Sequence, residues 1–106
     1  MANKEFIKYL DKAGCELLRL RIRTEKGKVI DIVVQYEFLI EAEWTPINRY
    51  DCAHEFFHRD VLIPGGEKEK QAIGIENLND ALLYAEQDLK DRWKLYKQRY
   101  IRQKKK

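Results

Sequence analysis

The segment Leu18-Arg19-Leu20-Arg21-Ile22-Arg23 decides the fold class, because apolar and basic residues alternate in it without interruption. Successive side chains of a β-strand point to opposite faces, so this period of two predicts a half-buried strand with an aliphatic face in the core. The opposite face is an arginine stripe. Such a stripe serves either as an RNA platform or in charge pairing with a neighbouring strand, and charge pairing is the commoner reason.

A second strand, over residues 29–40, is predicted to form an antiparallel hairpin with the first. The loop is expected at residues 25–27, where Gly27 supplies a positive φ. This register predicts two cross-strand pairs, Ile22 with Ile30 and Arg21 with Asp31. All the apolar side chains of the hairpin then lie on one face of the sheet.

The other elements are predicted from local patterns. A helix is predicted over residues 4–13, where Gly14 ends it, and a turn at 41–43. Two strands follow, one over 44–50, whose Pro46 indicates an edge or a bulge, and one over 57–63, which Pro64-Gly65-Gly66 ends. Residues 67–75 are predicted to hold a loop or a short strand, and a last helix runs from a cap at Asn77 to about residue 102. The sequence therefore predicts one α+β domain over residues 1–106. It consists of an antiparallel sheet of three to five strands, a short N-terminal helix, a long C-terminal helix and a frayed tail at 103–106.

The C-terminal helix combines an apolar stripe with basic charge. Residues 90–106 contain nine Lys or Arg and one acid, whereas residues 1–89 carry a net charge of −5. A basic end on an acidic body can attract a phosphate backbone or an acidic partner. The candidate residues for binding nucleic acid or a partner are Arg92, Trp93, Tyr96, Lys97, Arg99 and Tyr100. The aromatic members suit stacking on bases, but a core stripe with snorkelling basic flanks is the commoner meaning of this pattern.

The same helix is expected to be longer than the sheet needs. About 25 residues span roughly 37 Å, so its far end is expected to project. Its aromatic side chains would then pack on the N-terminal helix or on another chain, such as a second copy in a homodimer.

The segment over residues 49–60 is the candidate for chemistry, because it holds both histidines of the chain. In a strand, His58 and Asp60 share one face, so the carboxylate can orient the imidazole. His54 joins that face if residues 54–58 are extended or form one helical turn. Two imidazoles acting as acid and base, with an arginine on the phosphate, can cleave RNA without a metal. The candidate catalytic residues are His54, His58, Asp51, Asp60, Arg49, Arg59 and Tyr50.

A structural role for this segment is the competing interpretation. Its ion pairs and hydrogen bonds can tie neighbouring strands together without any catalysis. A zinc site built from Cys15, Cys52, His54 and His58 lacks paired knuckle spacing, and no metal or cofactor is predicted. Two cysteines and the absence of a long apolar run predict a reduced protein in the cytoplasm, neither secreted nor inserted in a membrane.

Three motifs carry a resemblance to known families. They are Val33-Val34-Gln35-Tyr36, the Arg-Tyr-Asp-x-x-His-x-x-x-His-Arg-Asp core at residues 49–60, and a closing helix with Leu82, Ala85, Asp88-Leu89 and Trp93. Over about residues 17–100 the chain resembles a family of small uncharacterised prokaryotic proteins. It is also similar, more distantly, to TumE-type toxins of toxin-antitoxin pairs, which are thought to act on RNA. That resemblance implies roles for His58, Arg59 and the Tyr50-Asp51 pair, and a small antitoxin partner.

Two functions are predicted from these observations. The first is a toxin-like cytoplasmic protein that binds RNA and cleaves it with His54 and His58. The second is a non-catalytic protein-interaction module in which the His/Asp cluster is structural. An exposed cleft holding both imidazoles would favour the first, and burial of His58 and Asp60 would favour the second.

Overall fold

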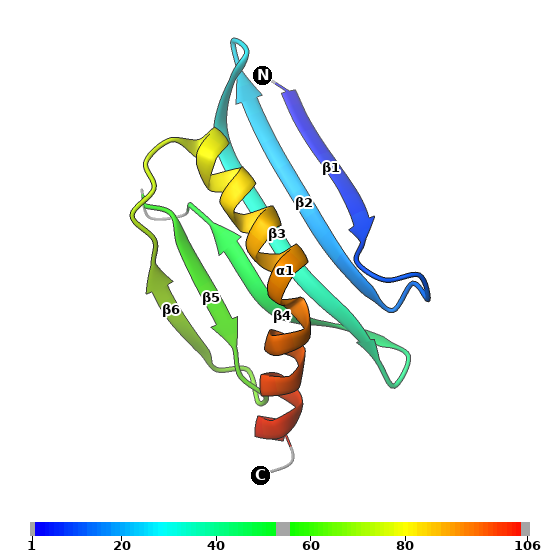
Figure 1. The fold of residues 1–106 in the computed structure, drawn as a ribbon. Helices are drawn as coiled ribbons and strands as arrows, with labels where there is room; N and C mark the ends of the chain where they lie inside the picture. Colours follow the sequence, from blue (N-terminus) through cyan, green and yellow to red (C-terminus); the bar gives the residue numbers. More distant parts are fainter. Residues whose placement is uncertain (1, 53–55, 105–106) are drawn as a thin grey trace.

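The computed structural model describes residues 2–52 and 56–104, which form a six-stranded antiparallel sheet and one long helix (Figure 1). The elements are β1 (Ala2–Tyr9), β2 (Glu16–Glu25), β3 (Lys28–Ile40), β4 (Glu43–Asp51), β5 (His58–Leu62), β6 (Lys68–Ala72) and α1 (Leu78–Lys104). The strands lie in the sheet in their order along the chain, so each strand pairs with its neighbours in sequence. The predicted α+β class and long C-terminal helix are confirmed, but there are more strands than predicted.

The predicted N-terminal helix is wrong, because residues 2–9 form the edge strand β1. Phe6, Ile7 and Leu10 have helical spacing, but only the backbone ladder to β2 decides the conformation here. In that ladder Phe6 lies opposite Leu20. Nearly all of β1 is exposed, so it has no buried face whose period could have indicated a strand.

The β2–β3 hairpin is confirmed, with a register two residues away from the predicted one. Its connection is the two-residue turn Lys26-Gly27, in which both residues have positive φ. A shift in register beside Arg23 then pairs Ile22 with Ile32. Because the shift is by an even number of residues, every side chain keeps its predicted face.

The later strands follow the local signals. Pro46 marks an irregularity in the β3–β4 register, and since β4 lies between β3 and β5 it is a bulge and not an edge. Within the uncertain segment 67–75, residues 68–72 form the edge strand β6. The turn at 41–43 and the break at Pro64-Gly65-Gly66 are both found where predicted.

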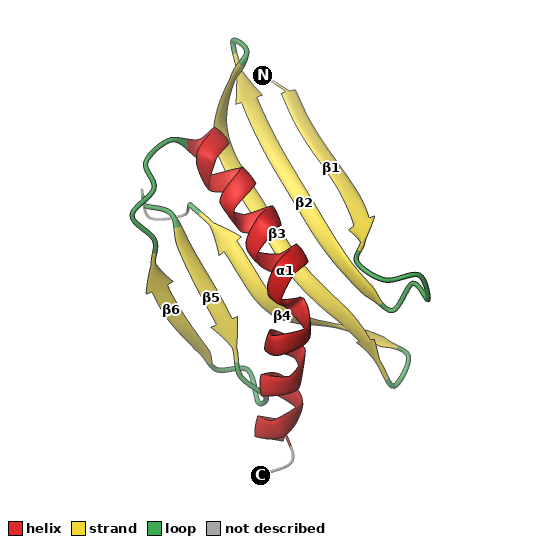
Figure 2. Ribbon diagram, in the orientation of Figure 1, coloured by secondary structure: helices red, strands yellow, loops and turns green. Residues whose placement is uncertain are grey.

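One face of the sheet, here called the helix face, is covered by α1 (Figure 2). Its core is aliphatic and aromatic: Leu18, Leu20, Ile32, Val34, Tyr36, Phe38, Ile47, Tyr50 and Phe57 from the sheet side, with Ala81, Ala85 and Leu89 from α1. The carbonyl side chain of Asn77 accepts a hydrogen bond from the backbone N–H of Asp80 at 3.1 Å, which confirms the predicted cap. The other side of the sheet, here called the open face, carries Arg19, Arg21 and Arg49.

The far end of α1 lies beyond β5 and β6 in Figure 1, as the expected length of the helix implied. Its aromatic residues, however, pack on the protein's own sheet. Trp93 meets Tyr36 edge to face, and Tyr100 meets Phe38 in the same way. The predicted need for another surface to cover these rings is therefore wrong. None of the helices in the described part of the chain has the length and apolar character that crossing a membrane requires.

Candidate functional site

The predicted catalytic residues are divided between the two faces of the sheet. β4 and β5 pair so that Asp51 lies opposite His58, and Tyr50 lies opposite Arg59. Alternation then places Arg49, Asp51, His58 and Asp60 on the open face, and Tyr50 and Arg59 on the helix face. The prediction that His58 and Asp60 lie on one face of the strand and Arg59 on the other is confirmed. His54 lies outside the described residues.

The open-face group, here called the His58 cluster (Arg49, Asp51, His58 and Asp60), is compact, and all its members except Arg49 are buried. Nε2 of His58 lies 2.9 Å from Oδ1 of Asp51 and 3.7 Å from Oδ2 of Asp60. Nε of Arg49 donates to Oδ2 of Asp51 at 2.9 Å. His58 is 2% exposed and Asp60 3% exposed, so a substrate cannot reach the imidazole directly. The arrangement fits a clasp between β4 and β5 or a buried ligand site better than an acid/base pair.

The helix-face group, here called the Tyr50 network (Tyr50, Arg59, Asp88 and Tyr96), joins the sheet to α1. The hydroxyls of Tyr50 and Tyr96 both donate to Oδ2 of Asp88, the second at 2.6 Å. Nη1 of Arg59 donates to both hydroxyls at 3.0 Å and lies 3.4 Å from the same carboxylate oxygen. Gln71 of β6 accepts from Nε of Arg59 at 2.8 Å.

Burial and the Asp88 carboxylate together set the protonation of the network. Burial, followed by the hydrogen bond to Asp88, raises the pKa of Tyr96 to about 12. The same two causes, in the same order, raise the pKa of Tyr50 well above its usual range. Both phenols are therefore neutral hydrogen-bond donors near neutral pH, and the network connects the sheet to α1.

The basic residues predicted on α1 each form an ion pair within the protein. Lys97 reaches the buried Glu16 at 3.2 Å, Arg99 reaches Glu69 at 3.2 Å, and Arg92 lies 3.7 Å from Oδ1 of Asp88. Glu16 also accepts from the hydroxyl of Tyr36 at 2.7 Å. These contacts fix the position of α1 while leaving much of the arginine side chains in solvent.

Two kinds of functional residue were missed from the sequence. Asp88 was assigned no role, although an acid among Ala81, Ala85 and Leu89 on the buried stripe of a helix is itself a signal of a buried partner. Lys68, whose Nζ lies 3.5 Å from Oδ2 of Asp60, carried no local signal, because β6 has no apolar pattern.

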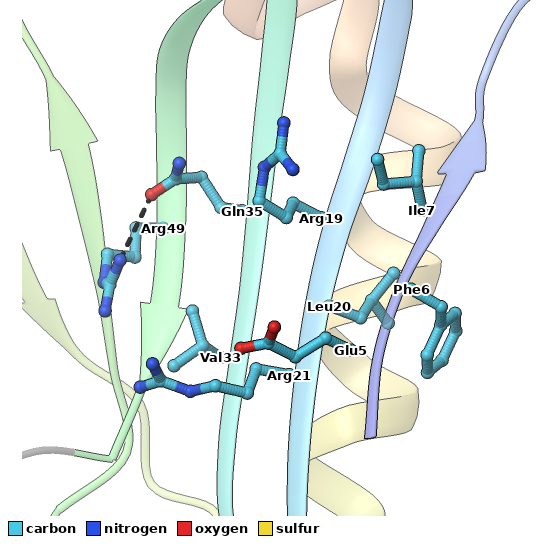
Figure 3. A pocket seen from close by; sticks show the side chains of 9 residues that line it. All are labelled: Glu5, Phe6, Ile7, Arg19, Leu20, Arg21, Val33, Gln35 and Arg49. Atoms are coloured by element: carbon cyan, nitrogen blue, oxygen red, sulfur yellow. Dashed lines mark hydrogen bonds between the residues drawn. The ribbon is translucent and has the colours of Figure 1, made fainter. Parts of the chain in front are cut away.

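The arginine stripe is only partly explained by charge pairing. Arg19 pairs with Glu37 at 2.8 Å, and Arg23 lies opposite Asp31 where Arg21 had been predicted. Arg21 forms no salt bridge within residues 2–52 and 56–104. Figure 3 shows Arg21 beside a pocket of about 370 Å³ on the open face, where Arg49 donates to Gln35 at 3.3 Å.

The cysteines are not part of either group. The thiol of Cys52 donates to Oδ1 of Asp31 at 3.0 Å, and Cys15 lies in the β1–β2 connection. Burial, and then the bond to Asp31, raises the pKa of the Cys52 thiol, which makes it a poor nucleophile. Cys15, Cys52 and His58, three of the four zinc ligands considered from the sequence, do not come together into one site.

Comparison with protein families finds that residues 1–106 match a domain of unknown function, DUF7718. No curated protein and no solved structure matches the chain.

Proposed function

Because the chain belongs to the DUF7718 family, whose function is unknown, its role has to be inferred from its own surface, and we propose that it binds RNA along the C-terminal half of α1. The observation that carries this proposal is the charge of residues 90–104, which hold seven Lys or Arg and a single acid, Asp91. Phosphate contacts supply most sequence-independent affinity for nucleic acid, so a long basic surface favours this class of ligand.

The charges available to a ligand lie at the far end of the helix. Lys90, Arg92, Lys97 and Arg99 each have an acidic neighbour within 4 Å. Lys94, Arg102 and Lys104 have no such neighbour in the described part of the chain, and all three are exposed. These three cations are therefore the ones expected to exchange their counterions for RNA phosphates.

RNA cleavage by His58 is not supported by the geometry of the His58 cluster. A general acid or base has to come within hydrogen-bonding distance of the proton it transfers, and the His58 imidazole is enclosed by two carboxylates. We therefore propose binding without acid/base chemistry at His58. A toxin-like role and a small antitoxin partner stay predictions. A cytoplasmic location also stays a prediction, and the free thiols of Cys15 and Cys52 support it.

The test is the salt dependence of binding to a fluorescein-labelled single-stranded RNA, followed by polarisation. The triple variant Lys94→Gln/Arg102→Gln/Lys104→Gln is expected to bind at least about tenfold more weakly at low salt. Its plot of log affinity against log salt should be shallower by about 2, since each lost phosphate contact on a single strand removes about 0.7. Incubation of the same RNA with and without EDTA checks for cleavage.

A matched control removes three charges elsewhere. Lys4, Lys26 and Lys28 are exposed and belong to the start of β1 and the β2–β3 connection. Figure 1 shows this end of the sheet opposite the C-terminus. The variant Lys4→Gln/Lys26→Gln/Lys28→Gln is expected to keep most of the affinity. Equal weakening by both triple variants would show a general charge effect and would overturn the proposed surface.

A protein-interaction module is the second candidate, because α1 also exposes apolar residues. Leu83 is 68% exposed and Leu95 61% exposed, which is unusual for leucines on a packed helix. This candidate would be favoured if the wild-type chain does not bind the RNA and light scattering shows that it is a dimer. The predicted homodimer through α1 would then involve these leucines and not the packed aromatic rings.

A further inference from the structure

The His58 cluster brings three metal-ligating side chains together in a buried place. One nitrogen of His58 and one oxygen each from Asp51 and Asp60 all lie within 4.8 Å of one another. The three residues are 8%, 2% and 3% exposed, in the order Asp51, His58 and Asp60. Strands β4 and β5 fix this convergence, because Asp51 and His58 are paired across the ladder and Asp60 follows His58 on the same face.

A backbone carbonyl faces one ring nitrogen of His58, and two carboxylates face the other. Nδ1 lies 3.3 Å from the carbonyl oxygen of Phe56, and a carbonyl oxygen can only accept. Nδ1 is therefore a donor, and Nε2, which faces carboxylate oxygens that also only accept, needs either a proton of its own or a metal ion. Three electron-rich atoms facing one another are unfavourable unless a cation lies between them. A backbone carbonyl on the far ring nitrogen is also the usual support of a metal-bound histidine.

A second observation points to the same place. Oδ1 of Asp60 is fully buried and has no hydrogen-bond partner in the described part of the chain. A buried carboxylate oxygen without a partner is costly, and the two ion-pair contacts of Asp60, to Lys68 and His58, involve Oδ2. The Asp60 carboxylate therefore has one unpaired oxygen, Oδ1, beside the oxygen Oδ2 that lies 3.7 Å from Nε2 of His58.

We infer that Asp51, His58 and Asp60 bind a divalent transition metal, with Zn²⁺ as the ion that best fits one imidazole and two carboxylates. Bonds of about 2.0 Å in a tetrahedral site place ligand atoms about 3.3 Å apart. The two distances from Nε2 of His58, 2.9 and 3.7 Å, lie on either side of that value, and the two carboxylate oxygens lie within 4.8 Å of each other. Water can supply the fourth ligand. Arg49 donates to the other oxygen of Asp51 and so orients the Asp51 carboxylate.

The experiment measures Zn²⁺ binding to the whole chain by calorimetry after EDTA treatment and buffer exchange. One Zn²⁺ per chain is expected, with a higher melting temperature in its presence. Asp60→Asn keeps the side-chain volume and should weaken binding by at least about a hundredfold. Glu37→Gln is the matched control, because Glu37 is also buried on the open face and paired with an arginine. It should change the affinity by less than about threefold.

Co²⁺ supplies a readout that needs no variant. The wild-type chain with Co²⁺ should show visible absorption bands of a four- or five-coordinate nitrogen and oxygen site, and no thiolate charge-transfer band. A thiolate band would assign the ion to Cys15 or Cys52 and overturn the inference. The absence of saturable Zn²⁺ binding would also overturn it, and would mean that a proton on Nε2 is the cation between the carboxylates. Equal Zn²⁺ affinities of Asp60→Asn and the wild type would overturn it as well.

Discussion

Among single residues, Asp88 does the most to determine how the helix meets the sheet. It is a carboxylate on the buried stripe of α1, and it accepts hydrogen bonds from Tyr50 and Tyr96 beside Arg59. A buried charge is tolerated when its hydrogen bonds are satisfied and an opposite charge is near. The Tyr50 network meets both conditions, so it fixes the register of α1 against β4 and β5.

Removing this carboxylate should be costly. We expect Asp88→Ala to lower the free energy of unfolding by about 3 kcal/mol, because it leaves two phenol donors without their acceptor and removes the negative charge beside Arg59. Urea denaturation measures the change. Asp91→Ala, on the exposed side of the same helix, is the control and should stay within about 0.5 kcal/mol of the wild type. A loss below about 1 kcal/mol for Asp88→Ala would contradict a stabilising network.

Sequence alternation predicts the faces of single residues well and their partners poorly. It placed His58 and Asp60 together and Arg59 opposite, because the period of a strand is two wherever the strand lies. Asp88 as the partner of Arg59 was not predictable, since 29 residues and the docking of a helix separate them. His58 is buried although it lies on the open face, away from α1, so its burial was also beyond the pattern.

At the scale of the element, β1 and α1 show what a local pattern can and cannot decide. α1 has a cap, a sustained apolar stripe and basic residues in its last turn, and each of these signals agrees with the others. β1 has no buried face, and Lys8 meets α1 only through an exposed ion pair to Glu86 at 2.7 Å. Three apolar residues were thus enough to suggest a helix where the hydrogen bonds of β2 impose a strand.

The cap of α1 can be tested by itself. Asn77→Ala should destabilise the protein by about 1 kcal/mol, because the N–H of Asp80 loses its acceptor in the first turn. Thermal unfolding is the measurement, and Asn77→Asp should restore the stability. Asn79→Ala is the paired control, since Asn79 is exposed within the helix and alanine suits that position. Equal losses in the two alanine variants would rule out a specific cap.

For the protein as a whole, the buried phenols of Tyr36 and Tyr50 and the half-buried phenol of Tyr96 make stability depend on alkaline pH. Burial is the first cause in each case, and a hydrogen bond to a carboxylate is the second, from Glu16 for Tyr36 and from Asp88 for Tyr50 and Tyr96. The folded protein therefore holds these protons more tightly than the unfolded chain, where the pKa is near 10.0. Stability is fully present below that pH and is lost as the pH rises above it.

We expect the free energy of unfolding to be flat with respect to these groups below pH 10 and to fall steadily up to about pH 12, as measured by urea titrations at fixed pH. Tyr96→Phe should make the decline shallower, because the variant has one phenol fewer to ionise on unfolding. Tyr9→Phe removes an exposed hydroxyl and serves as the control. A decline of the same steepness in Tyr96→Phe and the wild type would contradict the assignment.

The order of the strands also affects how the protein is made. Each strand pairs with its neighbour in sequence, so the sheet can form by successive hairpins as the chain leaves the ribosome. The covering element, α1, is synthesised last of those described. Until its final turns emerge, rings such as Tyr36 and Phe38 lie on an uncovered sheet. The nascent chain is therefore a natural client for chaperones that shield apolar surface, and a ribosome stalled shortly before residue 104 would display an aggregation-prone intermediate.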